Sequence, residues 1–347
     1  MKSNRRTMLL AATLAVPMTA FALTAPSAAQ DMTPAADGPC AGMEIFVAQA
    51  NPGFPRLPIY VAKFGGFFAK TGLDVRIAVT NSGADATAAL VGRSADVNAG
   101  TFGDVLLARS RGAPIVAFAA SGYEEISNLV IKKAVMDENG LDASSPADEK
   151  IRALKGLRVG VTSPGSSTDL LVRSILAQQG LTDKDVQIIA VGASAIAPTF
   201  VRGQIDAFAL SSPSANAASA IGDGEVAIKF ATGEYPGASD TLSMTMNTSE
   251  RALEDKKQEL VCFRDAIAGA LALMKSDPEK ATELAWNEFD GVVDRAAFDA
   301  TIGENISAFA DDTHITAEAA RKRRDFLTLA VPSLKDVDVE SAFSNLD

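Results

Sequence analysis

Histidine is nearly missing from this chain of 347 residues, which contains a single one, His314. Ser-His-Asp and Cys-His catalysis would both depend on that residue, yet it follows the polar run 311–313, as in a surface loop. With only two cysteines, Cys40 and Cys262, the chain also has too few strong ligands for a zinc site. Carboxylates are plentiful, but no pair stands out as a general acid and base. The sequence therefore predicts a protein that is not an enzyme and needs neither a metal nor a cofactor.

An excess of positive charge is missing as well. Lys and Arg number 32 against 43 Asp and Glu, which gives a formal net charge of −11. Proteins that bind nucleic acid need clustered Lys and Arg, and the chain has neither a Walker-type phosphate loop nor a G-x-G-x-x-G run after a strand. These absences exclude nucleic acid as a partner and favour small solutes and another protein.

The first 29 residues have the layout of a cleaved export signal. Three basic residues precede an apolar stretch at 8–23, which Pro17 interrupts and which is shorter than the roughly 20 residues that span a bilayer. Small residues up to Ala29 then predict cleavage near that position and a mature protein in the periplasm. A retained N-terminal membrane anchor is the alternative. Because Arg5-Arg6 resembles a twin-arginine signal, the export route, general secretory or twin-arginine, stays open.

Export also bears on the two cysteines. Disulfides form and persist in the periplasm, so Cys40 and Cys262 either form a bridge or remain two free thiols.

Over most of the chain, short β-branched segments alternate with helical ones, which predicts an α/β fold with mostly parallel sheets. The chain is longer than the roughly 250–300 residues at which single cores split, so two lobes are expected. Strands are predicted at 44–48, 74–79, 96–99, 115–119, 129–132, 158–161, 186–190, 207–210 and 226–230. Helices are predicted at 58–70, 84–91, 103–111, 168–179, 195–202 and 214–221, and then, in a purely helical C-terminal part, at 249–275, from 277 onward, at 295–309 and at 316–329.

Two segments of the chain repeat each other loosely. GLDVRIAV at 72–79 returns as GL at 180–181 and DVQIIAV at 185–191. Each segment is followed by a predicted helix and then by an aspartate that begins a strand, Asp96 in the first copy and Asp206 in the second. The repeat predicts two structurally related lobes.

Ligands of open parallel sheets bind at the carboxyl ends of the strands, so the loops at 49–57, 81–83, 100–103, 120–123, 163–168, 192–194 and 211–213 are predicted to form the walls of one cleft. These loops are rich in Ser, Thr and Gly, whose hydroxyls and accessible backbone N–H groups suit an anionic or acceptor-bearing solute. The predicted ligand-binding residues are Asn51, Phe54, Ser82, Thr101, Phe102, Ser121, Tyr123, Ser166, Ser167, Thr168, Ser211 and Ser212.

Several of these assignments have alternatives. The hydroxyls at 166–168 either bind the ligand or cap the helix that begins there. The three aromatic residues form apolar walls of the cleft or belong to the core. If Glu124 or Asp169 faces the cleft, a neutral or cationic ligand with N–H donors is expected instead.

The order and spacing of several short motifs resemble a known family. They are PIYVA at 58–62, GFF at 66–68, GLDV at 72–75, LKGLRVGV at 154–161 and GQIDA at 203–207. Residues 44–245 are similar to solute-binding proteins of ABC importers, in the branch that covers nitrate, sulfonate, taurine and thiamine-precursor pyrimidines.

The resemblance implies a type II-like periplasmic-binding-protein fold, in which two crossover strands join the lobes and a hinge closes them over the ligand. The expected lobes are 42–124 plus 240–347 and 125–239, with crossovers near 122–128 and 235–242 and with the C-terminal helices on the first lobe.

The function implied is capture of a small organic solute, such as a sulfonate, a carboxylate or a pyrimidine, for an inner-membrane ABC permease, by a monomer. Alternatives are an enzyme on the same scaffold, since the family includes a desulfinase branch and a pyrimidine-synthase branch that rely on Cys and His, and a periplasmic ligand sensor.

Overall fold

A computed structural model describes residues 33–50 and 53–346. The predicted export signal at 1–29 and Asn51 lie outside the described residues. In the part of the chain that the structure describes, no helix is both long and apolar enough to cross a membrane.

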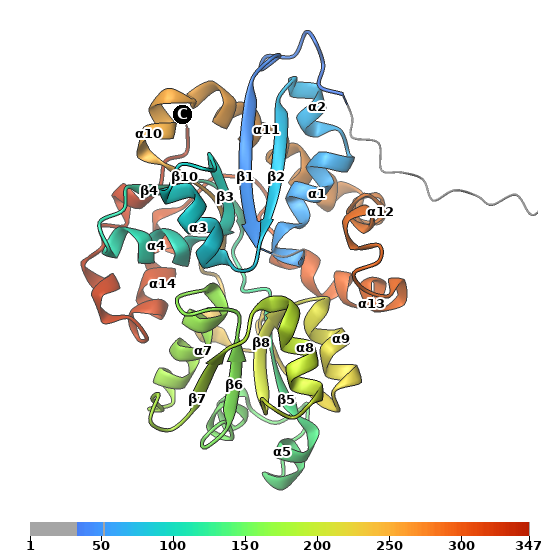
Figure 1. Ribbon diagram of the computed structural model, residues 1–347, viewed down its shortest axis with the longest axis vertical. Coiled ribbons are helices and arrows are strands. Elements are labelled where there is room, and N and C mark those ends of the chain that lie inside the picture. Colours follow the sequence, from blue (N-terminus) through green and yellow to red (C-terminus); the bar gives the residue numbers. More distant parts are fainter. Residues whose placement is uncertain (1–32, 51–52, 347) are drawn as a thin grey trace, which may run out of the picture. The chain divides into compact units, whose positions relative to one another are not determined.

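Ten strands form two five-stranded sheets (Figure 1). The first sheet has the order β2-β1-β3-β10-β4, with β1 (Glu44–Ala50), β2 (Asp74–Thr80), β3 (Val97–Thr101), β4 (Ile115–Gly122) and β10 (Met244–Ser249). The second has the order β7-β6-β8-β5-β9, with β5 (Ser127–Lys132), β6 (Arg158–Val161), β7 (Gln187–Ala190), β8 (Ala207–Ser211) and β9 (Gly224–Lys229).

The predicted two-lobed α/β class with mostly parallel sheets is confirmed, and each sheet is mixed because one of its strands runs against the others. Strands β2, β1 and β3 run parallel in the first sheet, as do β7, β6 and β8 in the second, but β10 and β5 are antiparallel to both of their neighbours. These two strands follow the segments by which the chain crosses between the sheets. The first crossover runs at 123–126, from β4 to β5, and the second at 230–243, from β9 to β10.

The predicted repeat corresponds to equivalent strands, because β2 and β7 occupy the same edge of their sheets. The two aspartates that follow are equivalent as well. Asp96 exchanges hydrogen bonds with the backbone of Phe46 in β1, and Asp206 does so with Arg158 in β6. In each case the aspartate N–H donates to the partner C=O (2.8 Å) and the carboxylate accepts the partner N–H (3.0 and 2.9 Å). Each aspartate therefore fixes the register of its sheet at the same place.

Strand β10 was not predicted, because its sequence MTMNTS alternates apolar and polar residues over four positions only and then ends on two polar residues. It lies buried between β3 and β4, where its polar side chains bond to one another and to the backbone. Thr245 donates to Asn247 (2.6 Å), Asn247 donates to the C=O of Thr101 (3.1 Å), and Thr248 donates to the C=O of Asp96 (2.7 Å). Satisfied hydrogen bonds make a polar interior strand tolerable.

Two predicted helices are each split in two. The segment 58–70 forms α1 and α2, because Gly65-Gly66 interrupts it and Gly66 adopts φ +71°. The segment 249–275 forms α10 and α11, with Lys256 in a non-helical conformation (φ −129°, ψ 31°) between them. The helices are α1 (Leu57–Phe64), α2 (Phe67–Thr71), α3 (Gly83–Val91), α4 (Phe102–Ser110), α5 (Lys133–Glu138), α6 (Ala147–Arg152), α7 (Ser167–Gln178), α8 (Ala193–Val201), α9 (Ser214–Ile221), α10 (Glu250–Asp255), α11 (Lys257–Ser276), α12 (Pro278–Phe289), α13 (Arg295–Asn305) and α14 (Ala317–Thr328).

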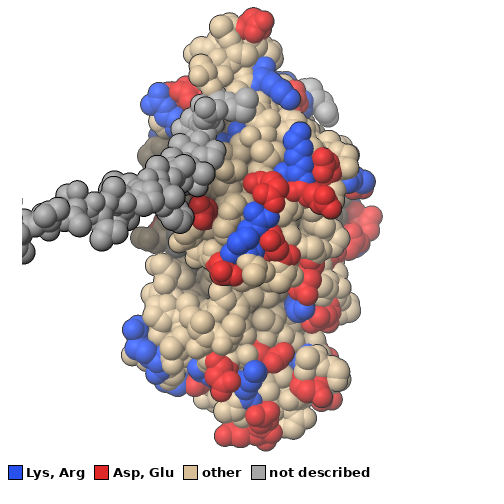
Figure 2. Space-filling view, turned by 90° about the vertical axis from the view of Figure 1, so that its right-hand side faces the viewer, with Lys and Arg blue, Asp and Glu red and all other residues tan. Residues whose placement is uncertain are grey.

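The C-terminal helices pack mainly on the first lobe. Helices α11 and α12 pack against α1, and α11 also covers β1 and β4. Helices α13 and α14 contact elements of the second lobe too, α13 at α9 and α14 at α7. The face that Figure 2 shows carries acidic and basic side chains interspersed, without a large basic area.

Of the two alternatives for the cysteines, the structure has the disulfide, with the Cα atoms of Cys40 and Cys262 6.5 Å apart. Cys40 lies in the turn before β1, and Cys262 lies on α11. The bridge thus attaches the segment before the first strand to a C-terminal helix.

Replacing both cysteines by alanine is expected to lower the free energy of unfolding by about 2–4 kcal/mol, because the bridge closes a long loop between residues 222 positions apart. Urea denaturation monitored by circular dichroism measures the change. A reductant should destabilise the wild type by a similar amount and leave the double variant unaffected. Equal stability of the two oxidised proteins would contradict the prediction.

Candidate functional site

A cavity of about 400 Å³ lies where loops of the two sheets meet. Its walls come from the segments after β1, β2 and β3 in the first sheet and after β6, β7 and β8 in the second, together with the first crossover and the loop between α12 and α13. The lobes also touch directly beside it, because the Phe54 N–H donates to the C=O of Ser212 at 3.0 Å. The cavity is thus built by the strand ends that the sequence predicts.

Four helices begin at this cavity: α3 at Gly83, α7 at Ser167, α8 at Ala193 and α9 at Ser214. The first N–H groups of a helix have no partner within it and carry partial positive charge. The Ser82 side chain caps α3 and Ser166 caps α7, whereas the first turns of α8 and α9 have no side-chain cap. The backbone alone therefore offers the cavity donors suited to an anion.

Arg56, in the short helix η1 (Phe54–Arg56) that follows β1, also lines the cavity. Its Nε is buried and has no hydrogen-bond partner among residues 33–50 and 53–346. Burial lowers the Arg56 pKa, and Tyr60, Asp104 and Glu125 oppose that shift. A guanidinium stays protonated in proteins, so Arg56 brings a positive charge to the wall.

Glu125 lines the same cavity from the first crossover, and its carboxylate is held on two sides. Oε1 accepts the backbone N–H (3.2 Å) and the hydroxyl (2.8 Å) of Ser127, and Oε2 accepts Nη2 of Arg323 on α14 at 2.9 Å. Glu125 is 4% exposed and Arg323 is fully buried. This interior ion pair joins the C-terminal helix to the wall of the cavity.

Asp104 supports the cavity from the first turn of α4. It forms a capping box with Thr101, whose N–H (2.7 Å) and hydroxyl (3.0 Å) both donate to its carboxylate. Burial raises the Asp104 pKa, while the hydrogen bonds from Thr101 and the charges of Arg56 and Arg323 lower it. The capping box holds Thr101, which lines the cavity, in place.

The structure brings five of the predicted ligand-binding residues together in the lining: Ser82, Thr101, Ser167, Thr168 and Ser211. Three others have polar roles outside it. The Ser166 hydroxyl accepts the N–H of Asp169 and forms hydrogen bonds with the hydroxyls of Thr162 and Thr168. The Ser212 hydroxyl accepts a hydrogen bond from the Asn128 side chain. The Ser121 carbonyl accepts the N–H of Ala310.

The three predicted aromatic residues lie away from the cavity lining. Phe54 is fully buried, with its ring 5.8 and 5.4 Å from those of Phe289 and Phe298. Phe102 is also fully buried. Tyr123 is half-buried, and its hydroxyl donates to the C=O of His314.

The sequence analysis missed Arg56 and Glu125, because it favoured hydroxyls and glycines, and it missed Ser127, which lies in strand β5 beyond the predicted loops. For Arg56 a signal exists, since it is the one Lys or Arg in the seven loops that the sequence assigns to the cleft. Glu125 lies two residues beyond the loop predicted at 120–123, where the first crossover begins. Other lining residues belong to the predicted cleft loops without being among the predicted ligand-binding residues: Ala50, Pro55, Asn81, Gly83, Ala193 and Ser194. The rest lie outside those loops: Thr162, Ala197, Leu210, Ser214, Ala217, Ala218, Ile221, Ser243, Met244, Val292 and Val293.

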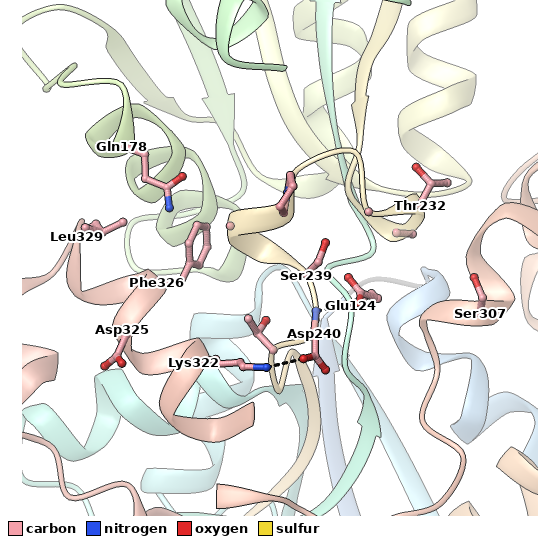
Figure 3. A pocket seen from close by; sticks show the side chains of 15 residues that line it. Glu124, Gln178, Thr232, Ser239, Asp240, Ser307, Lys322, Asp325, Phe326 and Leu329 are labelled. Atoms are coloured by element: carbon pink, nitrogen blue, oxygen red, sulfur yellow. Dashed lines mark hydrogen bonds and ion pairs between the residues drawn. The ribbon is translucent and has the colours of Figure 1, made fainter. Parts of the chain in front are cut away.

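The two acids that could have reversed the expected ligand charge lie outside this lining. Asp169 accepts the N–H of Gly165 and pairs with Arg173 at 2.7 Å. Glu124 lines a second, open pocket of about 920 Å³ formed by both crossovers, α7 and α14 (Figure 3). There it accepts the N–H of Asp240 at 2.8 Å, and the carboxylate of Asp240 pairs with Lys322 on α14.

The cavity lining contains neither histidine nor cysteine. Within residues 33–50 and 53–346, no group of three or more His, Cys, Asp or Glu residues is placed to hold a metal ion. The lining instead combines one guanidinium, one paired carboxylate, many hydroxyls and an apolar surface that includes Leu210, Ile221 and Val292. Such a site can bind an organic anion through hydrogen bonds and apolar contact.

Residues 54–281 match the model of the family described as NMT1/THI5 like. Among curated proteins, the chain is 27% identical over 151 residues to 4-amino-5-hydroxymethyl-2-methylpyrimidine phosphate synthase of Uromyces fabae, a match that covers 44% of this chain and 40% of that protein. The enzyme of the same name from Schizosaccharomyces pombe is 26% identical over 150 residues, covering 43% and 39%. The chain thus spans about two-fifths of the length of these relatives.

Among solved structures, a protein of Bordetella bronchiseptica RB50 is similar with a TM-score of 0.76 and 27% identity, over 87% of this chain and 94% of that one. The alkanesulfonate-binding protein SsuA of Xanthomonas axonopodis pv. citri, bound to MOPS, has a TM-score of 0.70 and 16% identity, over 88% and 99%. The periplasmic nitrate-binding protein NrtA of Synechocystis PCC 6803 has a TM-score of 0.64 and 16% identity, over 87% and 86%. The last two likenesses confirm the periplasmic-binding-protein fold.

Replacing Phe54 by alanine is expected to lower the free energy of unfolding by about 3–5 kcal/mol, because it leaves a void among buried aromatic rings. Urea denaturation measures this loss, and Ser82→Gly, at the cavity wall, provides the comparison with a much smaller effect. A Phe54→Ala protein as stable as the wild type would place Phe54 outside the core.

Proposed function

The chain belongs to the NMT1/THI5-like family, and from that premise we propose that it is the extracytoplasmic solute-binding component of an ABC-type importer. Its solute is a small organic anion, captured in the cavity between the two sheets. The observation that carries the proposal is the convergence of four helix N-termini and the guanidinium of Arg56 on one cavity.

The electrostatics of the cavity favour an anion. Each helix N-terminus is equivalent to roughly half a positive charge, and four of them meet at the cavity that Arg56 also lines, whose buried Nε has no hydrogen-bond partner among the described residues. The carboxylate of Glu125 is already paired with Arg323. A sulfonate or carboxylate group would therefore find donors that the folded protein leaves unsatisfied.

The apolar part of the lining supports an organic ligand rather than a bare inorganic ion. Ala218 and Ile221 of α9 and Val292 and Val293 of the loop between α12 and α13 line the cavity together with Met244. Burying the carbon skeleton of a ligand against such side chains contributes about 25 cal/mol per Å² of apolar surface.

The names of the curated relatives favour one alternative, an enzyme on the same scaffold. Against it stands the composition of the lining, which offers neither an imidazole nor a thiol for nucleophilic or acid–base chemistry. Binding without chemical change agrees better with this set of side chains.

Transport also requires a membrane permease and export of the binding protein to the periplasm. Solved relatives are named as periplasmic and as binding proteins of sulfonate and nitrate, and the sequence predicts an export signal at 1–29. We infer a monomer that works in the periplasm and delivers its ligand to an inner-membrane permease.

Arg56→Met is expected to weaken binding of an alkanesulfonate or a short carboxylate about 10- to 100-fold, because it removes one charge-assisted hydrogen bond. Isothermal titration calorimetry with propane-1-sulfonate and with butyrate measures the change. Arg202→Met, which removes an exposed arginine outside the cavity, is the control and should bind as the wild type does. Unchanged affinity of the Arg56→Met variant would show that the guanidinium does not contact the ligand.

A ligand found by thermal-shift screening should be recovered unchanged from the pure protein. At 100 times its Kd such a ligand adds about 2.7 kcal/mol to stability, which raises the melting temperature measurably. Mass spectrometry of the ligand after prolonged incubation then distinguishes a binding protein from an enzyme. Conversion of the ligand, absent from a buffer control, would establish the enzyme instead.

A further inference from the structure

The cavity holds a negative group beside its positive one. Arg56 lies in η1 and Glu125 in the first crossover, and both line the cavity. They are close enough for the charge of Glu125 to raise the Arg56 pKa against the effect of burial. An anion that binds to Arg56 in this cavity therefore shares the cavity with a carboxylate.

The hydrogen bonds of Glu125 leave room for one more donor. A carboxylate has about four acceptor positions, two on each oxygen. Ser127 fills both positions of Oε1, with its N–H and its hydroxyl, and Arg323 fills one position of Oε2. Because Glu125 lines the cavity while 4% exposed, a ligand is the group placed to fill the remaining position.

Arg323 holds this carboxylate without lining the cavity itself. Its side chain is fully buried on α14, and its Nε and Nη1 have no hydrogen-bond partner among the described residues. Nη2 is the one nitrogen with a bond, and that bond goes to Glu125. A buried cation with two unsatisfied donors is costly, which is hard to explain by stability alone.

We propose that Glu125 is a specificity-determining residue that accepts an N–H donor of the ligand, and that Arg323 is its positioning residue. The inference rests on the proposed function and narrows it. The ligand is an organic anion that also carries an amine, amidine or amide N–H at the end away from its anionic group. An anion without such a donor leaves the buried Glu125 carboxylate facing an apolar group, which is unfavourable.

The test compares two probes of nearly equal shape, 2-aminoethanesulfonate and propane-1-sulfonate, which differ by an ammonium in place of a methyl group. The wild type should bind the amino compound about 10- to 100-fold more tightly, as expected for one charge-assisted hydrogen bond. Glu125→Gln should bring the two affinities to within about threefold, because it removes the charge that distinguishes the ammonium from the methyl group. Calorimetry measures all four dissociation constants.

Arg323 is tested through the same ratio of affinities. Arg323→Met should lower the preference for the amino compound, and Arg323→Lys, which keeps a cation next to Glu125, should restore much of it. Arg321→Met is the matched control, because Arg321 lies on the same helix in an exposed ion pair with Glu340. It should leave the ratio unchanged.

Folding is checked separately, since a single change leaves a buried charge without its partner. The double variant Glu125→Gln/Arg323→Met removes both charges, and its melting temperature and circular-dichroism spectrum report whether the fold is intact. Wild-type protein that binds both sulfonates equally would overturn this inference and leave the proposed function standing. Wild-type protein that binds neither, nor butyrate and 3-aminopropanoate, would overturn both.

Discussion

The two sheets are connected by two chain segments, and most of the architecture depends on how these segments are held together. Thr241 and Ser243 of the second crossover donate backbone hydrogen bonds to Tyr123 (2.9 Å) and Gly122 (3.1 Å) at the start of the first. Helix α14 contacts both crossovers, through the N–H of Leu242, which donates to the C=O of Ala319, and through the ion pair between Arg323 and Glu125. These bonds restrict how the two connecting segments can bend, so the C-terminal helix takes part in the geometry of the cavity.

The duplicated topology explains why the site is rich in backbone donors. Both sheets have the same strand order, and Asp96 and Asp206 fix equivalent strands in register. The loops that precede α3 and α8 therefore lie at corresponding edges of the two sheets. Where the lobes meet, helix N-termini from both sides line the same cavity. The backbone alone therefore produces an electrostatic field that attracts anions, whatever the side chains are.

Local sequence signals predicted the parts of the fold that depend on local chemistry. Nine strands and the capped helices could be located because β-branched runs and terminal glycines are local properties. Strand β10 could not, because its threonines and asparagine are stable only beside β3 and β4, which are distant in sequence. The same distinction holds in the cavity. The positions of Ser82 and Thr101 there could be predicted because each lies at the carboxyl end of a strand. The role of Glu125 could not, because it depends on Arg323, 198 residues away.

The aromatic residues show the limit of interpreting loops by composition. Phe54 lies two residues from Arg56 in η1 (Phe54–Arg56), yet one side chain joins the core and the other lines the cavity. The tight turn of η1 and the rings of Phe289 and Phe298 on C-terminal helices decide between them. Proteins named as binding proteins share this fold, and a fold does not by itself determine function, so the side chains that line the cavity decide what the scaffold does. In this chain those side chains are a guanidinium, a paired carboxylate and hydroxyls, which under the proposed function recognise a ligand by charge and hydrogen bonding without changing its covalent bonds.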